Sequence, residues 1–131
     1  MGYIDLGKQQ GATLHHGGER VGNEGYFIRP TIFTDTTPDM KIVQEEIFGP
    51  VCVLMRFKDE DDIVHQANDS IYGLAAAVFS QNITRALSTA HRLRAGTVWV
   101  NIYNMLYPNV PFGGYKQSGI GRELGEYALA K

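Results

Sequence analysis

The sequence lacks the features that identify membrane, nucleic-acid-binding or disulfide-bonded proteins. Twelve basic against fourteen acidic residues give a net charge of −2, so no basic excess attracts nucleic acid or anionic lipid. No apolar run approaches the roughly 20 residues that a membrane-spanning helix needs, and the first residues lack the charged-then-apolar form of a signal peptide. The single cysteine, Cys52, excludes an internal disulfide. We therefore expect no nucleic-acid partner and no membrane partner.

The remaining composition is that of an ordinary globular protein. Apolar residues make up 44% of the 131 residues and charged residues 20%, enough for one domain with a substantial core. A lone cysteine favours a reducing compartment, and we expect a cytoplasmic protein. A mitochondrial form whose transit peptide has been removed would have the same composition.

Two further kinds of site are missing from the sequence, a metal site and a phosphate-binding glycine loop. His15 and His16 are adjacent, and adjacent residues of a strand point to opposite faces, so we expect no shared metal site. The glycines at 113, 114, 119 and 121 match neither the dinucleotide fingerprint nor the P-loop. We interpret them as a backbone turn that packs closely against another element.

What the sequence does contain is a regular alternation of strands and helices after residue 50. Three apolar runs predict strands, at 51–57, 74–79 and 97–101. Helix signals lie between them, an acidic start at 59–62 and a cap at Asn82. Strands joined by helices in this order form right-handed βαβ crossovers. The predicted fold class is α/β, with an open parallel sheet in three layers.

The first fifty residues are less regular. Residues 1–11 carry Tyr3, Ile4 and Leu6 and predict the last turns of a helix. Residues 26–33 are rich in aromatic and β-branched side chains, which predicts a strand. Because Pro30 has no amide to donate, that strand lies at a sheet edge or is broken at the proline.

The residues after the last predicted strand depart from the alternation. An aromatic and amide-rich loop covers 101–108, and ligands of open parallel sheets bind at the carboxyl ends of strands. We therefore expect this loop to form a pocket wall. A glycine-rich segment and a short helical run from 123 to about 129 follow. Ala130 and Lys131 add no closing element, and we expect both chain ends to be interior points of a longer fold.

The most informative segment is Gln-Glu-Glu-Ile-Phe-Gly-Pro-Val at 44–51. Glu46 and Phe48 place a carboxylate and an aromatic ring two residues apart, a pair that binds a hydroxylated, planar ligand by hydrogen bonding and stacking. A second interpretation treats Glu45 and Glu46 as an acid–base couple. Neighbours in sequence need not face each other, however, and a solvated helix end also explains two adjacent glutamates. Phe48 as a core residue is the plain alternative to a ligand contact.

Cys52 is the one thiol that nucleophilic catalysis could use. It lies within the apolar run 51–55, and a thiol buried among apolar side chains is normally inert. No accompanying Cys-His-Asn pattern is evident. We predict no catalytic residue in this chain, and thiol labelling of the native protein tests the alternative in which Cys52 serves a different chemistry.

Four motifs occur along the chain in a characteristic order and spacing. They are Glu-Glu-Ile-Phe-Gly-Pro at 45–50, Tyr-Gly-Leu-Ala at 72–75, Ala-Gly-Thr-Val-Trp-Val-Asn at 95–101 and Pro-Phe-Gly-Gly-Tyr-Lys-Gln-Ser-Gly at 111–119. Together they closely resemble the C-terminal part of the catalytic domain in the NAD(P)-dependent aldehyde dehydrogenase superfamily. The resemblance covers essentially the whole chain.

The resemblance implies roles for five residues. In that family a cysteine attacks the aldehyde, hydride passes to the nicotinamide of NAD or NADP, and a glutamate-activated water hydrolyses the thioester. The resemblance implies that Glu46 holds the hydroxyls of the nicotinamide ribose and that Phe48 packs near the nicotinamide. It further implies that Asn104, Leu106 and Phe112 line the aldehyde tunnel, where apolar walls suit an apolar or modest-sized aldehyde.

The family's reactive groups have no counterpart in this chain. Its nucleophilic cysteine, its general-base glutamate and its nucleotide-binding domain all lie upstream of these motifs, and Cys52 follows the ribose-binding motif. The family's oligomerisation strand after the last helix is absent too. Residues 1–131 therefore resemble a single partial domain. We expect the chain alone to bind no cofactor and to oxidise no aldehyde.

Two functional hypotheses remain open at this point. In the first, the chain is the C-terminal piece of an aldehyde dehydrogenase. In the second, it is a natural short homologue that acts as a non-catalytic binding or oligomerisation module, which size-exclusion with and without full-length enzyme would distinguish. A fragment that lacks its neighbouring elements exposes apolar surface, and we therefore predict self-association through an edge strand or an uncovered sheet face.

Overall fold

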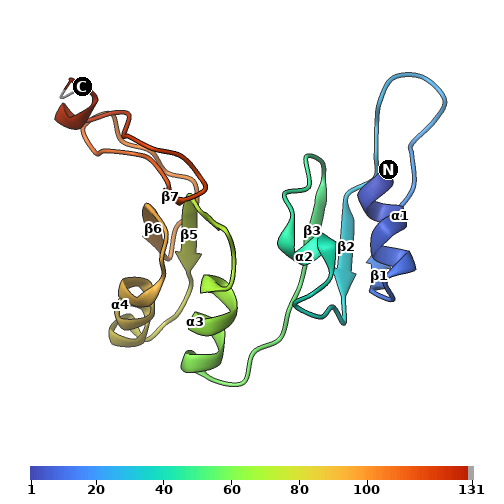
Figure 1. The fold of residues 1–131 in the computed structure, drawn as a ribbon, viewed down its shortest axis with the longest axis horizontal. Helices are drawn as coiled ribbons and strands as arrows, with labels where there is room; N and C mark the ends of the chain where they lie inside the picture. Colours follow the sequence, from blue (N-terminus) through green and yellow to red (C-terminus); the bar gives the residue numbers. More distant parts are fainter. Residues whose placement is uncertain (130–131) are drawn as a thin grey trace. The chain divides into compact units, whose positions relative to one another are not determined.

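A computed structural model of the chain describes residues 1–129, which form two compact units (Figure 1). The first unit is Met1–Phe57, and the second begins at Lys58. Each contains helices and a parallel pair of strands, which confirms the predicted α/β class. The predicted chain end at Ala130 and Lys131 lies outside the described residues. Among residues 1–129, no helix combines the length and the apolar character needed to cross a bilayer.

The first unit is a three-stranded sheet with two helices. Its elements are α1 (Gly2–Gln9), β1 (Thr13–His16), β2 (Thr31–Thr34), α2 (Lys41–Gln44) and β3 (Val51–Val53). β2 lies in the middle of the sheet, antiparallel to β1 and parallel to β3. The helix predicted within residues 1–11 is confirmed as α1.

The core of the first unit forms around Phe33, which is completely buried in β2. Ile4 from α1 and Ile42 from α2 belong to the same cluster. A methyl group added at Gly7 would lie 3.0 Å from side-chain atoms of both Phe33 and Ile42, so the glycine lets α1 approach the sheet closely. This packing fixes α2, from whose end the segment carrying Glu46 leaves.

Two strands of the first unit are shorter than the apolar runs that predicted them. The strand expected over 26–33 begins at Thr31, directly after Pro30, so the predicted break is confirmed and the alternative of an edge position is wrong for β2. Tyr26, before the break, is almost fully exposed. The strand expected over 51–57 ends at Val53. Apolar residues often remain on the surface, so an apolar run overestimates the length of a strand.

The second unit contains the βαβ crossover that the sequence predicted. Its elements are α3 (Glu60–Asn68), β4 (Tyr72–Gly73), β5 (Ala75–Val78), α4 (Ile83–Arg92), β6 (Thr97–Val100), β7 (Tyr115–Lys116) and the 3₁₀ helix η1 (Glu126–Leu129). β5 and β6 are parallel and are joined by α4, with Ala75 opposite Thr97. β4 and β7 form a separate antiparallel pair.

The strands are distributed over more sheets than the sequence suggested. The described strands form one three-stranded and two two-stranded sheets. The helical run expected over 123–129 is limited to η1, because Glu123 pairs with Phe112 in an isolated antiparallel bridge. Strand pairing depends on contacts between distant residues, which a local apolar pattern does not specify.

Side-chain caps define the beginnings of α3 and α4. The Asp59 carboxylate accepts a hydrogen bond from the Asp62 amide at 2.9 Å, and the Asn82 side chain accepts one from the amide three residues later at 3.0 Å. The sequence predicted both helix starts. Asp62 in turn accepts from the Gln66 side chain and from the Lys58 amide, and these bonds hold the pKa of its carboxyl below the ordinary value.

Removing the Asn82 cap should destabilise the second unit measurably. We expect Asn82→Ala to lower the free energy of unfolding by about 1 kcal/mol, because the Arg85 amide loses its acceptor. Urea denaturation followed by circular dichroism measures the loss. Gln81→Ala is the matched control, since Gln81 is exposed and lies just before the cap. Equal losses in the two variants would contradict a capping role.

Candidate functional site

The segment between α2 and β3 presents the two predicted cofactor residues to solvent. The helix ends at Gln44, and Glu45 already has extended backbone geometry (φ −103°, ψ 152°). Side chains of an extended segment alternate between its two sides. Ile47 is half-buried against the core cluster, so Glu46 and Phe48 point the other way. The Phe48 ring is 90% exposed.

The adjacent glutamates of this segment have different surroundings. The Glu45 carboxylate accepts a hydrogen bond from the Tyr3 hydroxyl at 2.8 Å and lies 3.9 Å from the Lys41 ammonium. The Glu46 side chain has no hydrogen-bond or ion-pair partner among residues 1–129. Glu45 is therefore engaged within the protein, whereas the Glu46 carboxylate is available to a ligand.

A turn at Gly49 and Pro50 connects this pair to the sheet. The Gly49 amide donates to the carbonyl two residues earlier at 3.0 Å, which closes the turn. The Pro50 carbonyl accepts from the Thr31 amide at 2.8 Å, which attaches the turn to the first residue of β2. Glu46 and Phe48 thus lie between a helix end and an anchored turn.

The loop after β6 carries two of the predicted substrate residues, Asn104 and Leu106. Both are exposed, and Asn104 has a φ of 57°, in the left-handed region that asparagine adopts more readily than most residues. The indole nitrogen of Trp99 donates to the Met105 carbonyl at 2.8 Å. The Trp99 ring also meets Tyr103 edge-on, with 5.6 Å between ring centroids. These contacts attach the middle of the loop to β6.

Phe112, the third predicted substrate residue, lies on the next segment and is half-buried. Its amide and carbonyl exchange hydrogen bonds of 2.7 and 2.8 Å with Glu123. Directly after it, Gly113 approaches Gly96 so closely that a Cβ at Gly96 would lie 1.7 Å from the Gly113 carbonyl oxygen. Backbone contacts on both sides therefore determine where the Phe112 ring lies.

The predicted cofactor pair and the predicted substrate residues belong to different units. Glu46 and Phe48 lie in the first unit, and Asn104, Leu106 and Phe112 lie in the second. Within each unit the residues occupy neighbouring stretches of chain. The first unit therefore contains two of the five predicted residues, and the second unit contains the other three.

Cys52 is exposed on β3, although the apolar run around it predicted burial. Val51 and Val53 pack toward the core, and strand alternation turns the residue between them outward. The prediction that the Cys52 thiol is unreactive rested on burial, and the exposed position removes that reason. No hydrogen bond joins the thiol to a base within the described chain, and residues 1–129 contain no group of three histidine, cysteine or acidic side chains arranged to hold a metal ion.

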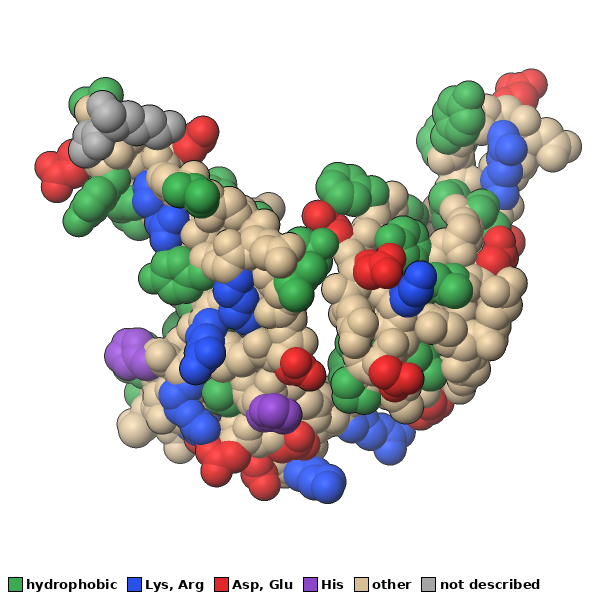
Figure 2. All heavy atoms as spheres, in the orientation of Figure 1, with side chains coloured by type: hydrophobic (Ala, Val, Ile, Leu, Met, Phe, Trp, Pro, Cys, Tyr) green, Lys and Arg blue, Asp and Glu red, His purple; other side chains and the backbone are tan. Residues whose placement is uncertain are grey.

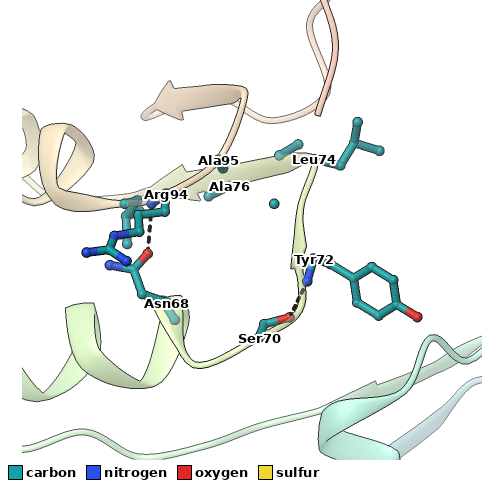
Figure 3. A pocket seen from close by; sticks show the side chains of 11 residues that line it. Asn68, Ser70, Tyr72, Leu74, Ala76, Arg94 and Ala95 are labelled. Carbon is teal, nitrogen blue, oxygen red and sulfur yellow. Dashed lines mark hydrogen bonds between the residues drawn. The ribbon is translucent and has the colours of Figure 1, made fainter. Parts of the chain in front are cut away.

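The second unit also contains a hollow of about 240 Å³ that the motifs did not indicate (Figure 3). None of the five predicted site residues is among the described residues that line this hollow. The Asn68 side chain closes one side, accepting from the Arg94 amide at 2.7 Å and donating to the Arg92 carbonyl at 2.9 Å. The sequence feature that could have predicted this hollow is the run of small side chains at 75–77.

The family model described as the aldehyde dehydrogenase family matches residues 1–131. The chain belongs to the aldehyde dehydrogenase family. The match spans all four motifs that carry the resemblance, and it confirms that resemblance. The exposed pair at Glu46 and Phe48 is thus a feature of an aldehyde dehydrogenase segment.

Individual aldehyde dehydrogenases are similar to this chain in both sequence and structure. The enzyme from Agaricus bisporus is 70% identical over 129 residues, which cover 98% of this chain and 26% of that protein. The NAD+ complex of aldehyde dehydrogenase from Bacillus cereus has a TM-score of 0.94 and 57% identity, with 98% and 26% covered. Betaine aldehyde dehydrogenase from Staphylococcus aureus in complex with NAD+ has a TM-score of 0.93 and 47% identity, with the same coverage. The chain spans about a quarter of the length of these relatives.

Proposed function

We propose that this chain supplies the nicotinamide-ribose clamp and part of the aldehyde-tunnel wall of an NAD(P)-dependent aldehyde dehydrogenase. The observation that carries the proposal is a Glu46 carboxylate with no partner among the described residues, two positions before a Phe48 ring that is 90% exposed. The NAD+ complexes of the Bacillus cereus and Staphylococcus aureus relatives support a nicotinamide cofactor.

The proposed reaction converts an aldehyde, oxidised cofactor and water into a carboxylic acid, reduced cofactor and a proton. The bound nicotinamide supplies the hydride acceptor. The Glu46 carboxylate would accept hydrogen bonds from the two vicinal hydroxyls of the nicotinamide ribose, and such charge-assisted bonds are stronger than neutral ones. Phe48 restrains the position of the flat ring by packing beside it. Both residues bind and orient, and neither breaks a bond.

The substrate wall consists of Asn104, Leu106 and Phe112 in this proposal. One amide beside an aliphatic and an aromatic side chain favours an apolar or modest-sized aldehyde, with the amide available to the carbonyl oxygen. A hydrophobic aldehyde soaked into crystals of the complete enzyme should bind against Phe112. An aldehyde bound elsewhere would contradict this part of the proposal.

A chimera tests the function directly. The 129 matched residues of the Agaricus bisporus enzyme would be replaced by this chain, which is 70% identical to them. We expect the chimera to reduce NAD+ in the presence of aldehyde, and we expect the purified 131-residue chain to produce no NADH above a mock preparation. A folded but inactive chimera, or steady NADH production by the chain alone, would contradict the proposal.

A second candidate function, a binding or oligomerisation module, is favoured by exposed apolar surface. Figure 2 shows hydrophobic side chains on the surface of both units, and those of Phe48, Phe79, Ile120 and Leu129 are at least 66% exposed. We expect the purified chain to self-associate, through the edges of its sheets or their uncovered faces. Light scattering measures this, and a monodisperse monomer would contradict it. Size-exclusion with and without the Agaricus bisporus enzyme then distinguishes pairing with a complete subunit from self-association.

We place the complete protein in the cytoplasm. Cys52, the single cysteine of these 131 residues, has an exposed thiol, and an exposed free thiol suits a reducing compartment. Cell fractionation followed by an antibody against this segment tests the assignment, and recovery with mitochondria would contradict it.

A further inference from the structure

The ammonium group of Lys116 is attached to the end of a helix that lies about fifty residues earlier in the chain. Its Nζ donates to the Asn68 carbonyl and to the Ser70 carbonyl, both at 2.9 Å. Asn68 is the last residue of α3, and the last carbonyls of a helix have no donor within the helix. A positive charge at this end also complements the helix dipole. Lys116 is therefore a side-chain cap supplied from a distant segment.

The backbone of Lys116 is strained in the same place. Its φ of 54° lies in the left-handed region, which a residue other than glycine adopts only when its surroundings fix it. The fixing contacts are the two carbonyls that the ammonium binds and the pairing of β7 with β4. The left-handed backbone conformation of Lys116 is therefore maintained by the contacts of its ammonium group with the end of α3.

Further backbone contacts join the residues around Lys116 to the segment before β5. The Gln117 amide donates to the Ile71 carbonyl at 2.9 Å, and the Gly73 amide donates to the Ser118 hydroxyl at 2.9 Å. Residues 115–118 and 71–73 consequently form one attached pair of segments. The glycines that flank residues 115–118 contribute no side chains, so these polar contacts and Lys116 hold the segment.

The attached segment leads directly to Phe112. Gly113 lies against Gly96, and Gly114 is buried and accepts from the Arg122 guanidinium at 3.0 Å. The backbone between Lys116 and Phe112 has little freedom to move, because Gly113 and Gly114 are each in close contact with another segment. Lys116 thus adds a third anchor to a segment whose other end is held by Glu123 and Gly96, and a displacement at Lys116 changes the backbone geometry next to Phe112.

We propose that Lys116 is a positioning residue for the aldehyde site, which clamps the segment 112–118 to the end of α3 and so sets the Phe112 ring. The inference rests on the proposed function, in which Phe112 contacts the aldehyde. Lys116 acts through the backbone and not through contact with the substrate.

Lys116→Met in the chimera tests the clamp, because it removes the ammonium while retaining an unbranched side chain. We expect the KM for hexanal to rise roughly tenfold, since sub-ångström to ångström displacements of a binding group have effects of this order. We expect the KM for NAD+ to change less than twofold, because Glu46 and Phe48 belong to the other unit. We expect kcat to change less than the KM for hexanal, because Lys116 contacts no reacting atom in the proposed site. Lys116→Arg retains the charge and should restore part of the loss.

Lys8→Met is the matched control, since the Lys8 ammonium also donates to a backbone carbonyl, that of Gly18, but within the first unit. Its KM for hexanal should stay within twofold of the parent value. A rise in the KM for hexanal equal to that of Lys116→Met would overturn the assignment, because the loss of any lysine–carbonyl contact would then be enough to raise this KM.

Hydrogen exchange in the same proteins tests the clamp without reference to activity. In Lys116→Met the amides of Phe112 and Gln117 should exchange faster, whereas the Ala86 amide in α4 should be unchanged. Unchanged exchange at Phe112 and Gln117 overturns the clamp whatever the kinetics show. A lowered melting temperature with an unchanged KM for hexanal also overturns it, leaving a purely stabilising role. An inactive parent chimera would instead contradict the proposed function, and exchange would still decide whether Lys116 holds the segment.

Discussion

Gly96→Ala is expected to lower the free energy of unfolding of the second unit by about 3 kcal/mol or more. The added methyl group would lie 1.7 Å from the carbonyl oxygen of Gly113 and 2.8 Å from its carbonyl carbon. Both are backbone atoms, which cannot rotate away as the end of a side chain can. The Gly96 amide donates to the Gly73 carbonyl at 3.0 Å, so the strand start is held as well. Either β6 or the Phe112 segment must therefore move.

Urea denaturation followed by circular dichroism measures this loss, and Gly2→Ala is the control. A Cβ at Gly2 has no heavy atom within 4 Å, so we expect a change of less than about 0.5 kcal/mol there. In the chimera, Gly96→Ala should also reduce aldehyde oxidation, because the displaced segment carries Phe112. Indistinguishable stabilities of the two variants would show that Gly96 and Gly113 do not approach closely in solution.

Glu46→Ala in the chimera is expected to raise the KM for NAD+ roughly 100-fold. Hydrogen bonds to a charged group contribute about 1.5–3 kcal/mol, and each 1.4 kcal/mol corresponds to tenfold in affinity. Stability should be unaffected, because the Glu46 side chain has no partner among the described residues. Steady-state kinetics with varied NAD+ measures the first effect, and thermal denaturation measures the second.

The neighbouring glutamate provides an internal comparison. Glu45→Ala removes the acceptor of the Tyr3 hydroxyl, so we expect a loss of about 1 kcal/mol in stability and an unchanged KM for NAD+. The opposite pattern, with Glu45→Ala impairing NAD+ use and Glu46→Ala lowering stability, would exchange the roles assigned to the two residues.

The starts of α3 and α4 were predictable because their signals are local, whereas the short α2 was not predicted. Asp59 and Asn82 each bond an amide three residues later, so the sequence around each residue contains the whole interaction. The strands were less predictable, since pairing and burial depend on distant residues. The apolar run at 51–57 extends past the end of β3, and Phe57 is 57% exposed. Cys52 illustrates the same point, because alternation and not local apolarity determines that it faces outward.

For the candidate site, the local geometry of the Glu46 and Phe48 segment was predictable, and the roles of its residues stay predictions. Glu46 and Phe48 flank the apolar Ile47, so alternation along an extended segment predicts that both side chains face away from the core. The four motifs connected these residues with a family. The contacts that hold the segments around Asn104 and Phe112 were not predictable. The bonds from Lys116 to Asn68 and Ser70 join residues 48 and 46 positions apart, respectively, and a side chain that bonds a distant backbone carbonyl leaves no periodic pattern in the sequence.

The contacts that attach the 101–108 loop to β6 also provide a fluorescent probe of that loop. Trp99, the only tryptophan in the chain, donates its indole hydrogen to Met105 and contacts the Tyr103 ring. Its intrinsic emission therefore originates from one known place, next to Asn104 and Leu106. Excitation of the isolated chain at the red edge of the indole band gives a spectroscopic record of that loop without an attached dye.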